Sequence, residues 1–370
     1  MSNRTALGAG LSVLVSLIVP KSVVPEATPL EKPLPSPAFP WLAEAQTPPE
    51  HLPAGAPRLS PVVPPQTLAQ MSPGDWNEHR RRIERLWTEY LGDIPAKRPP
   101  LNSRVLDAEQ APSFLRQRIT YEAEAGVPVE AYLLVPREGK RSFPAVVVFH
   151  STVDYTIRQP AGLEGPADKH IGVHLAERGY VALCPQNYIW DYGGLKWMDA
   201  VAKVKRDHPD WKGMMKMIWD GIRAVDYLCS LDYVDKERIG CIGHSLGGKE
   251  ALFLAAFDPR IKVTVSSEGG IGLTFSNWEA EWYLGPDIRK PSFPLDNNQV
   301  LALIAPRPFL LLGGDSADGD KSWPYLLSVK PIYDLLEASD AIAFFNHKQG
   351  HAYPPEAQKR AYEWIDHWLK

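Results

Sequence analysis

Hydrophobic residues recur along residues 72–370 with two different periods. Continuous apolar runs are typical of buried parallel strands, whereas apolar residues spaced by three and four positions are typical of helices packed on a sheet. The runs predict strands over 145–149, 180–184, 239–243, 261–266, 308–312 and 341–345, and the spacing predicts helices over 168–178, 211–231, 249–257, 325–336 and 355–369. This alternation predicts an α/β fold with a mostly parallel central sheet and helices on both faces.

Further segments complete the predicted fold. An amphipathic helix is expected to begin near Ser72, and strands over 115–122 and 129–136 are joined by turn residues. The stretch 269–297 interrupts the alternation with three prolines and three large aromatic side chains, those of Trp278, Trp282 and Tyr283. We expect this stretch to form a small cap insertion beside the functional site.

The first 71 residues differ in composition from the rest of the chain. Residues 5–20 are uncharged and largely apolar, which predicts a signal or anchor segment over 1–20 and favours an exported protein over a cytoplasmic one. Fourteen of the 36 prolines lie within residues 20–65, so 21–71 is predicted to be a linker or a wrapping arm. The main domain is then expected to span 72–370.

Charge and cysteine content narrow the classes of partner. The formal net charge is -4, and the chain contains no extended Lys/Arg-rich segment, which argues against nucleic-acid binding. Cys184, Cys229 and Cys241 each lie in apolar runs and are expected to be buried thiols. A small-molecule or polysaccharide substrate fits this composition better. Membrane insertion is not expected apart from an N-terminal anchor, and the composition leaves the oligomeric state open.

The segment Gly243-His244-Ser245-Leu246-Gly247 carries the strongest chemical signal. It lies between a predicted strand and a predicted helix, which is the setting of a nucleophile elbow, where a tight turn exposes the serine hydroxyl. A serine that merely caps the helix is the alternative interpretation. We predict that Ser245 is a nucleophile and that the Leu246 N–H faces the oxyanion that its attack would form.

A serine nucleophile requires a base and an acid that follow later strands. His351 follows the last predicted strand, and Gly350 lets its loop turn, so His351 is predicted to be the base, with His347 as the competitor. Asp318 follows the preceding strand and is predicted to be the acid. Two other aspartates of that loop, Asp315 and Asp320, remain alternatives.

Other polar residues near predicted strand ends have weaker signals. The loop after the strand that ends at residue 149 is expected to supply the second oxyanion donor, the Thr152 N–H, and His150 is expected to shape that loop. His170 and His174 stand one helical turn apart, as metal ligands can, but no third ligand follows, so a solvated helix face is the better interpretation. No metal or organic cofactor is expected.

These motifs resemble the acetyl xylan esterase-like and dienelactone hydrolase-like branch of the α/β-hydrolase superfamily over about 72–370. The elbow and Gly350-His351 carry most of the resemblance. Dienelactone hydrolases proper use a cysteine nucleophile, whereas this chain has Ser245. The resemblance implies an α/β-hydrolase fold and an esterase acting on acetylated carbohydrate or related small esters through a Ser-His-Asp triad and an acyl-enzyme.

A second resemblance, to the glucuronoyl esterases, implies roles for two more residues. In those enzymes a lysine one turn after the nucleophile contacts the sugar, and a glutamate contributes binding or the catalytic acid; Lys249 and Glu268 occupy comparable positions. Leu246 replaces their arginine. We therefore expect Lys249, Glu268, Trp278 and Trp282 to contact substrate, and Glu268 is a further alternative acid.

Two other functions compete with a carbohydrate esterase. A serine peptidase of the prolyl-oligopeptidase kind shares the same catalytic elements but usually carries a large N-terminal propeller, which residues 1–71 are too few to build. A hydrolase-fold binding protein without catalysis would not need Ser245, Asp318 and His351 together. The sequence therefore favours a serine carboxylic-ester hydrolase, with a glucuronoyl-type ester hydrolase as the nearest alternative.

Overall fold

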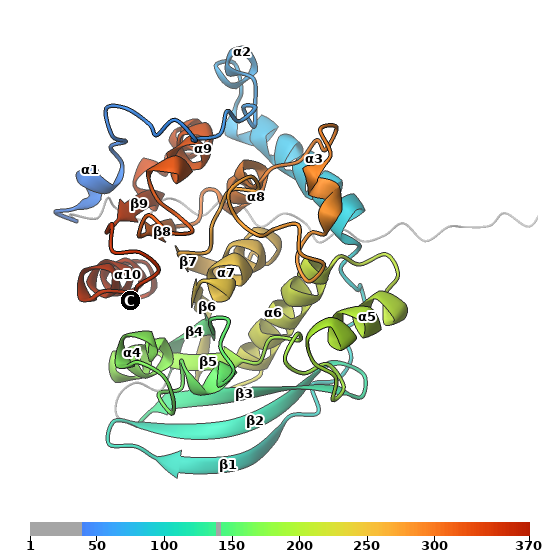
Figure 1. The fold of residues 1–370 in the computed structure, drawn as a ribbon. Helices are drawn as coiled ribbons and strands as arrows, with labels where there is room; N and C mark the ends of the chain where they lie inside the picture. The colour runs from blue at the N-terminus through green and yellow to red at the C-terminus, as the bar shows by residue number, and fades with distance from the viewer. Residues whose placement is uncertain (1–38, 138–141) are drawn as a thin grey trace, which may run out of the picture. The chain divides into compact units, whose positions relative to one another are not determined.

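A mixed sheet forms the centre of the molecule. Within residues 39–137 and 142–370, which this computed structural model describes, nine strands form one sheet in the order β1-β2-β3-β5-β4-β6-β7-β8-β9 (Figure 1). The strands are β1 (Arg104–Gln110), β2 (Phe114–Glu124), β3 (Val127–Pro136), β4 (Phe143–Phe149), β5 (Val181–Pro185), β6 (Val234–His244), β7 (Ile261–Ser267), β8 (Phe309–Gly313) and β9 (Ile342–Asn346). Pairing is antiparallel from β1 to β5 and parallel from β5 to β9.

The register gathers the carboxyl ends of the parallel strands at one edge of the sheet. Phe149 pairs with Gly243, and Gly243 pairs with Ser266. Gly313 pairs with Asn346 on the far side. Ligand and catalytic sites of open α/β sheets lie at such an edge, and the loops that carry the candidate residues all begin there.

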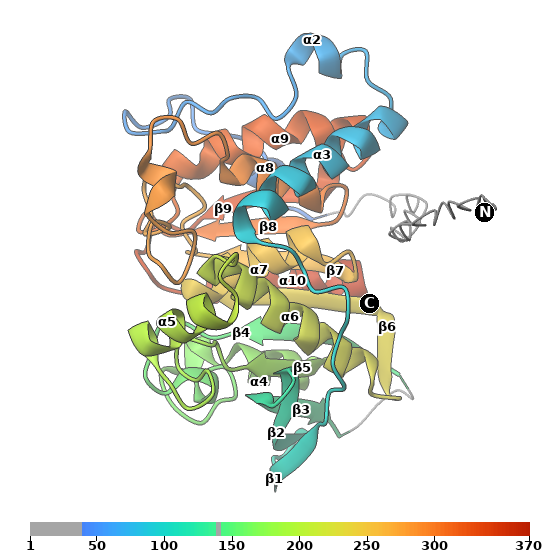
Figure 2. The same cartoon turned by 90° about the vertical axis from the view of Figure 1, so that its right-hand side faces the viewer.

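Helices cover both faces of the sheet (Figure 2). The larger apolar core includes residues of α3 (Pro73–Leu91), α5 (Trp197–Asp207), α6 (Gly213–Cys229), α7 (Leu246–Phe257), α8 (Asn297–Ile304) and α9 (Trp323–Leu335). The core of the opposite face includes residues of α1 (Leu42–Ala45), α4 (Ile171–Glu177) and α10 (Pro355–Leu369). A short helix, α2 (Pro65–Leu68), has no buried residue. The predicted α/β fold with helices on both faces is confirmed.

One strand and two α-helices within residues 72–370 escaped the sequence prediction. All residues of β1 are exposed, so the strand has no hydrophobic alternation to reveal it. The helix α5 buries Ala200, Val201 and Val204. The short helix α8 follows the irregular stretch and is capped by the Asp296 side chain. Short elements bury few residues, which leaves little periodicity to read.

Residues 39–71 pack against the main domain. The Trp41 indole donates a hydrogen bond to Glu363 on α10 at 2.8 Å, and the Gln46 amide donates to the Ser339 and Ile342 carbonyl oxygens. The described residues all fall in one compact unit. This part of the predicted linker or arm is therefore docked on the domain. The predicted signal or anchor segment, 1–20, lies outside the described residues, among which no helix is long and apolar enough to cross a membrane.

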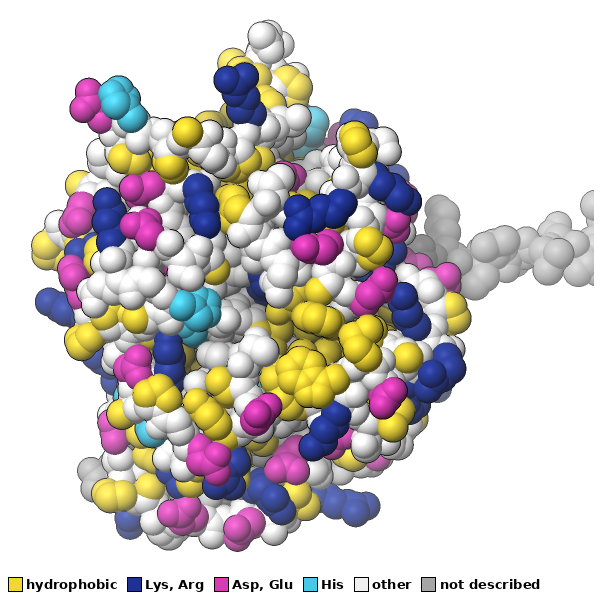
Figure 3. Space-filling model, viewed as in Figure 1, with side chains coloured by type: hydrophobic (Ala, Val, Ile, Leu, Met, Phe, Trp, Pro, Cys, Tyr) yellow, Lys and Arg dark blue, Asp and Glu magenta, His cyan; other side chains and the backbone are white. Residues whose placement is uncertain are grey.

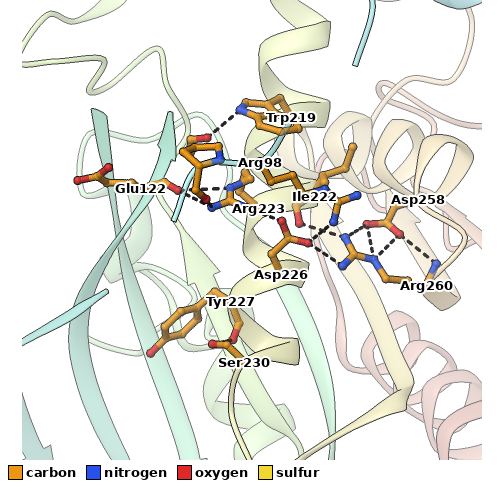
Figure 4. A network of polar contacts seen from close by, with 12 residues as sticks. Arg98, Glu122, Trp219, Ile222, Arg223, Asp226, Tyr227, Ser230, Asp258 and Arg260 are labelled. Atoms are coloured by element: carbon orange, nitrogen blue, oxygen red, sulfur yellow. Dashed lines mark hydrogen bonds and ion pairs between the residues drawn. The ribbon is translucent and has the colours of Figure 1, made fainter. Parts of the chain in front are cut away.

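A partly buried ion-pair network fastens the end of α6 away from the candidate site (Figure 4). Asp226 accepts hydrogen bonds from Arg98, Arg223 and Arg260 at 2.5 to 2.7 Å. Arg223 also donates to the Glu122 carbonyl oxygen at the end of β2. Because α6 packs on both the sheet and α7, this network holds the frame on which the site is built.

Candidate active site

Ser245 occupies a strained turn between β6 and α7. Its φ of 61° and ψ of -118° lie outside the conformations that most residues adopt. A Cβ on Gly243 would lie 2.2 Å from the Gly247 carbonyl carbon, and a Cβ on Gly247 would lie 2.5 Å from the Phe149 carbonyl oxygen. Only glycine therefore fits on either side, and this steric requirement is the physical content of the elbow motif.

His351 lies in the loop between β9 and α10 and pairs with a buried carboxylate. Its Nδ1 is 2.9 Å from Glu268 Oε2. The Glu268 side chain is fully buried, whereas the His351 side chain is 44% exposed. Because an ionised carboxylate only accepts hydrogen bonds, Nδ1 carries the proton, which leaves Nε2 as the acceptor nitrogen.

Glu268 reaches His351 because of its position just after β7. Its backbone adopts a left-handed φ of 48°, and its carboxylate also accepts hydrogen bonds from the N–H groups of Gly314, Ala317 and Asp318 at 2.5, 2.8 and 3.2 Å. Burial raises the pKa of Glu268, but the hydrogen bonds from His351 and these N–H groups outweigh it and hold the pKa below its ordinary value. Glu268 is therefore anionic.

The prediction that Asp318 pairs with His351 is wrong in this structure. Asp318 is fully buried, and its carboxylate accepts hydrogen bonds from the Gly270 and Ile271 N–H groups and from the Ser322 hydroxyl. The loop after β8 turns so that its backbone N–H groups hold Glu268 while the Asp318 side chain holds the start of the cap at Gly270 and Ile271. Asp318 therefore has a structural role, and its side chain is bound by Gly270, Ile271 and Ser322 instead of His351.

The other candidates for acid and base have their own partners. Asp315 and Asp320 both accept hydrogen bonds from the Asn346 amide, at 2.7 and 2.9 Å. His347 is buried, and its Nδ1 accepts from the Gln349 N–H. None of the three contacts His351, so the alternatives that the sequence left open reduce to Glu268.

The predicted oxyanion donors lie on two adjoining loops. The Leu246 N–H is the first of α7 and, like the Thr152 N–H, takes part in no backbone hydrogen bond within the described residues. Gly247 packs against the Phe149 carbonyl, so the start of α7 and the loop after β4 touch. A helix N-terminus and a loop N–H that meet in this way can face a developing negative charge.

His150 holds the second of these loops in place. Its Nδ1 is 2.7 Å from the Ser151 carbonyl oxygen, and its Nε2 accepts the Asn187 N–H at 3.2 Å. Burial lowers the pKa of His150 to about 4, so the ring is neutral. This arrangement agrees with the structural role expected for His150.

Lys249 lies one turn into α7 and is almost completely buried. Its ammonium donates hydrogen bonds to the Gly269 carbonyl oxygen and to the Ser276 hydroxyl, and it lies 4.2 Å from the centre of the Trp278 ring. Burial lowers the pKa of Lys249 to about 7. The Lys249 side chain is thus held by two hydrogen bonds and by the Trp278 ring within the protein.

Trp278 and Glu268 were predicted to contact substrate, but both side chains are buried within the protein. Trp278 is 0% exposed, and its indole donates to the Gly270 carbonyl oxygen at 2.7 Å. It packs between Phe253 and Tyr283 and supports the cap rather than lining a pocket. Trp282 is half-buried and stays a candidate for contact.

Sequence analysis missed Lys169, which contacts the residue beside the nucleophile. Its ammonium lies 2.8 Å from His244 Nε2, and His244 Nδ1 lies 2.9 Å from the Ser267 hydroxyl. The His244 ring centre is 4.8 Å from that of His351. Burial lowers the pKa of Lys169 to about 8, and that of His244 well below its ordinary value. No motif marks Lys169, because only tertiary contact brings it to His244.

Metal ligands are not grouped in the part of the chain that the structure describes, where no set of three His, Cys, Asp or Glu side chains could hold an ion. His174 Nδ1 lies 2.7 Å from the Tyr362 hydroxyl, and His170 Nε2 lies 3.2 Å from the Gly165 carbonyl oxygen. The histidine pair of this helix therefore has separate protein partners.

Comparison with known proteins shows what this chain is similar to. Residues 129–291 match the model of the dienelactone hydrolase family. The Bacillus subtilis protein YtaP, named as a hydrolase, is 28% identical over 309 residues, which span 79% of this chain and 99% of that protein.

Solved structures share the fold at low identity. A glucuronoyl esterase from Solibacter usitatus superposes with a TM-score of 0.70 and 17% identity, covering 86% of this chain and all of its own. A Bacteroides fragilis protein named as an acetyl xylan esterase superposes with a TM-score of 0.62 and 15% identity, covering 83% of this chain and 81% of its own. Residues 129–291 are thus similar to the dienelactone hydrolase family, and the chain shares its α/β fold with these solved esterase structures.

Proposed function

We propose that this protein is a serine carboxylic-ester hydrolase in which Ser245, His351 and Glu268 form the catalytic triad. The observation that carries the proposal is the pairing of His351 with the buried, anionic Glu268 at the same sheet edge as the strained elbow of Ser245. Such a pair fixes the tautomer that a general base requires. A histidine held only for packing would not need a buried charge behind it.

The reaction proceeds in two halves through these residues. His351 Nε2 takes the Ser245 proton as the serine oxygen attacks the ester carbonyl, and Glu268 stabilises the imidazolium that forms. The imidazolium then protonates the leaving alcohol, which yields an acyl-enzyme. Water, deprotonated by the same nitrogen, attacks the acyl carbonyl and releases the acid and free Ser245.

The oxyanion of each tetrahedral intermediate is held by the Leu246 and Thr152 N–H groups. Both belong to rigid parts of the molecule, since Leu246 begins α7 and the loop of Thr152 is tied down by His150. Preorganised donors of this kind are worth about 3 to 4 kcal/mol each in related chemistry. Leu246 offers no guanidinium, so backbone groups carry this role.

The substrate class that we propose is an acetylated carbohydrate or a related small ester. The names of two structural relatives, a glucuronoyl esterase and an acetyl xylan esterase, support a sugar ester. The resemblance of Lys249 to the sugar-contacting lysine of the glucuronoyl esterases also supports a sugar ester. An ester of a glucuronate carboxyl is the second candidate, because the glucuronoyl esterase has the higher TM-score of the two.

A substrate panel tests the proposal. Wild type and Ser245→Ala are compared on p-nitrophenyl acetate, acetylated xylan, a methyl glucuronate ester and a peptide amide. We expect ester hydrolysis by wild type only, with acetylated xylan preferred over the methyl glucuronate. Equal ester turnover by Ser245→Ala would refute the nucleophile, and preference for the amide would replace the esterase with a peptidase.

Export of the protein remains a prediction from residues 1–20. Fractionation of the producing cell tests it: the chain is expected in the periplasm or the medium, and a cytoplasmic chain would contradict it.

A further inference from the structure

Two tryptophans, a buried Trp190 and an exposed Trp197, lie beside the loop that carries Thr152. The Trp190 ring meets His150 edge-to-face with 5.0 Å between ring centres, and the Trp197 ring lies 4.9 Å from Trp190. His150 directly precedes the oxyanion loop. Two ring contacts therefore connect Trp197 to the candidate active site.

The two tryptophans differ in exposure. Trp190 is 6% exposed, whereas Trp197 is 43% exposed at the start of α5, and the next residue, Met198, is 53% exposed. Figure 3 shows hydrophobic side chains gathered on this face, beside a hollow in its centre, and α5 and its preceding loop lie on the same face in Figure 1. Trp190 acts as the support and Trp197 as the accessible surface.

The chain holds Trp197 outward at an energetic cost. Trp197 has a φ of 50°, a conformation that bulky side chains rarely adopt, and its N–H is bound by the Ile189 carbonyl oxygen at 2.5 Å. Backbone strain at an exposed aromatic residue is typical of a functional position. Neither burial nor core packing explains this placement.

Hydrogen bonds hold the loop that supports the two tryptophans. Asn187 donates its N–H to His150 and accepts the Ile189 N–H. Tyr188 donates its hydroxyl to the Trp282 carbonyl oxygen in the cap. The segment thus bridges the oxyanion loop and the cap, which are the two borders that a bound substrate would meet.

The size and polarity of the surface formed by Trp197 and Met198 indicate which kind of ligand it could bind. One indole face with Met198 is too small to dock a protein or a membrane, which require larger apolar areas. Exposed Lys196 and Asp199, of opposite charge, lie close to Trp197 in the sequence. An apolar ring face with a polar rim of no net charge matches a neutral pyranose, whose C–H face is apolar and whose hydroxyls lie at its edge.

We propose that Trp197, supported by Trp190, is a binding subsite for a neutral sugar ring of the ester substrate, one that lies beyond the sugar carrying the scissile ester. This inference rests on the proposed esterase function and names its substrate class as an oligosaccharide or a polysaccharide rather than a free monosaccharide ester. The subsite binds the chain and takes no part in bond cleavage.

Kinetics of Trp197→Ala test the subsite. We expect kcat/KM on acetylated xylo-oligosaccharide to fall about three- to tenfold, through KM, because one aromatic stacking contact is lost. Turnover of p-nitrophenyl acetate, which cannot reach the ring, should stay within about twofold. Trp197→Phe keeps a ring and should recover most of the loss, and Leu327→Ala, at an exposed apolar position on α9, is the matched control. An equal loss on both substrates, or no loss on the oligosaccharide, would overturn the subsite.

Binding without turnover separates this inference from the proposed function. Titration calorimetry compares acetylated xylo-oligosaccharide binding to Ser245→Ala and to the Ser245→Ala, Trp197→Ala double variant. Weaker binding by the double variant supports the subsite even if wild type hydrolyses no ester, and equal affinity refutes it even if wild type is an esterase. Should Trp197→Ala fold poorly, Trp197→Gly takes its place, since glycine adopts a positive φ without strain.

Discussion

At the scale of single residues, the acid behind His351 is decided by side-chain reach. Glu268 directly follows β7, the strand that pairs with β6 of the nucleophile. Its backbone has a left-handed φ, and its side chain, longer than that of an aspartate, reaches His351. Asp318 belongs to the loop after β8 and points back toward the cap. The longer side chain of Glu268 and its left-handed backbone conformation therefore decide that Glu268, and not Asp318, pairs with His351.

Paired substitutions of these two acids separate the roles. Glu268→Gln should lower kcat by about 10²- to 10⁴-fold, because an amide neither stabilises the imidazolium nor fixes the tautomer. Asp318→Asn should keep kcat within about tenfold while lowering the melting temperature, because its amide replaces an acceptor of two backbone N–H groups. Kinetics on p-nitrophenyl acetate and thermal unfolding of both variants provide the measurement, and the reverse pattern would restore Asp318 as the acid.

A buried carboxyl on α7 makes stability depend on pH. Burial raises the pKa of Glu250 to about 8, against a smaller lowering by a hydrogen bond to Asn187. The folded state then holds a proton that the unfolded state releases above pH 4.5, the ordinary value. Its contribution to the free energy of unfolding therefore falls as pH rises from about 4.5 to about 8 and levels off beyond.

Glu250→Gln tests this contribution, because glutamine does not titrate. The free energy of unfolding of wild type, relative to the variant, should fall between pH 5 and pH 8 by at most roughly 1.4 kcal/mol per pH unit. Urea unfolding at pH 5, 6, 7 and 8 gives the difference, in which the effects of other titrating groups cancel. A difference independent of pH would mean that Glu250 is ionised in the folded protein.

At the scale of elements, the elbow depends on the contact between α7 and β4. Gly247 lies so close to the Phe149 carbonyl that the helix start and the oxyanion loop are positioned by one backbone contact. The same contact sets the place of the Leu246 N–H. Catalytic geometry at this edge is therefore a property of how two elements pack.

Gly247→Ala should damage both stability and turnover. Its Cβ would lie 2.5 Å from the Phe149 carbonyl oxygen, so the start of α7 must shift, at about 1 to 3 kcal/mol of the free energy of unfolding. We expect kcat to fall at least about tenfold, because the Leu246 N–H moves with the helix. Gly55→Ala is the control, since a Cβ there meets nothing within 4 Å; equal behaviour of the two variants would contradict the steric argument.

At the scale of the whole molecule, residues 39–71 add a docked segment to the hydrolase domain. Trp41 is 8% exposed, contacts Phe39 and Trp364, and donates its indole N–H to Glu363. This aromatic cluster covers part of α10, the helix that follows the loop of His351. We expect this cluster to affect stability and not turnover, because it lies on the opposite face of the sheet from α7.

Trp41→Ala should lower the free energy of unfolding by about 3 kcal/mol, since a buried indole is removed. Esterase kcat should stay within about twofold, because no site residue contacts Trp41. Urea unfolding and p-nitrophenyl acetate kinetics check both parts, with the exposed Leu52→Ala expected to change stability by less than about 0.5 kcal/mol. Unchanged stability of Trp41→Ala would show that the segment is not docked in solution.

The sequence by itself determined the fold class and predicted the nucleophile and the base. Strand runs and helix spacing are local patterns, and Gly243 of the elbow is required because a Cβ there would meet Gly247 within the same five residues. Gly350 and His351 follow the last strand directly. Signals of this kind survive without three-dimensional information, because the residues that cause them are neighbours in the chain.

Only the tertiary structure decided which carboxylate serves His351 and which aromatic rings face solvent. Glu268 and His351 are 83 residues apart, and three aspartates were equally acceptable by order alone. Trp278 was expected to contact substrate and is fully buried, while Trp197, which no periodicity marked, is exposed. Hydrogen-bond reach and burial are set by how loops from different strands pack at the sheet edge, and the spacing of residues along the chain does not encode that packing locally.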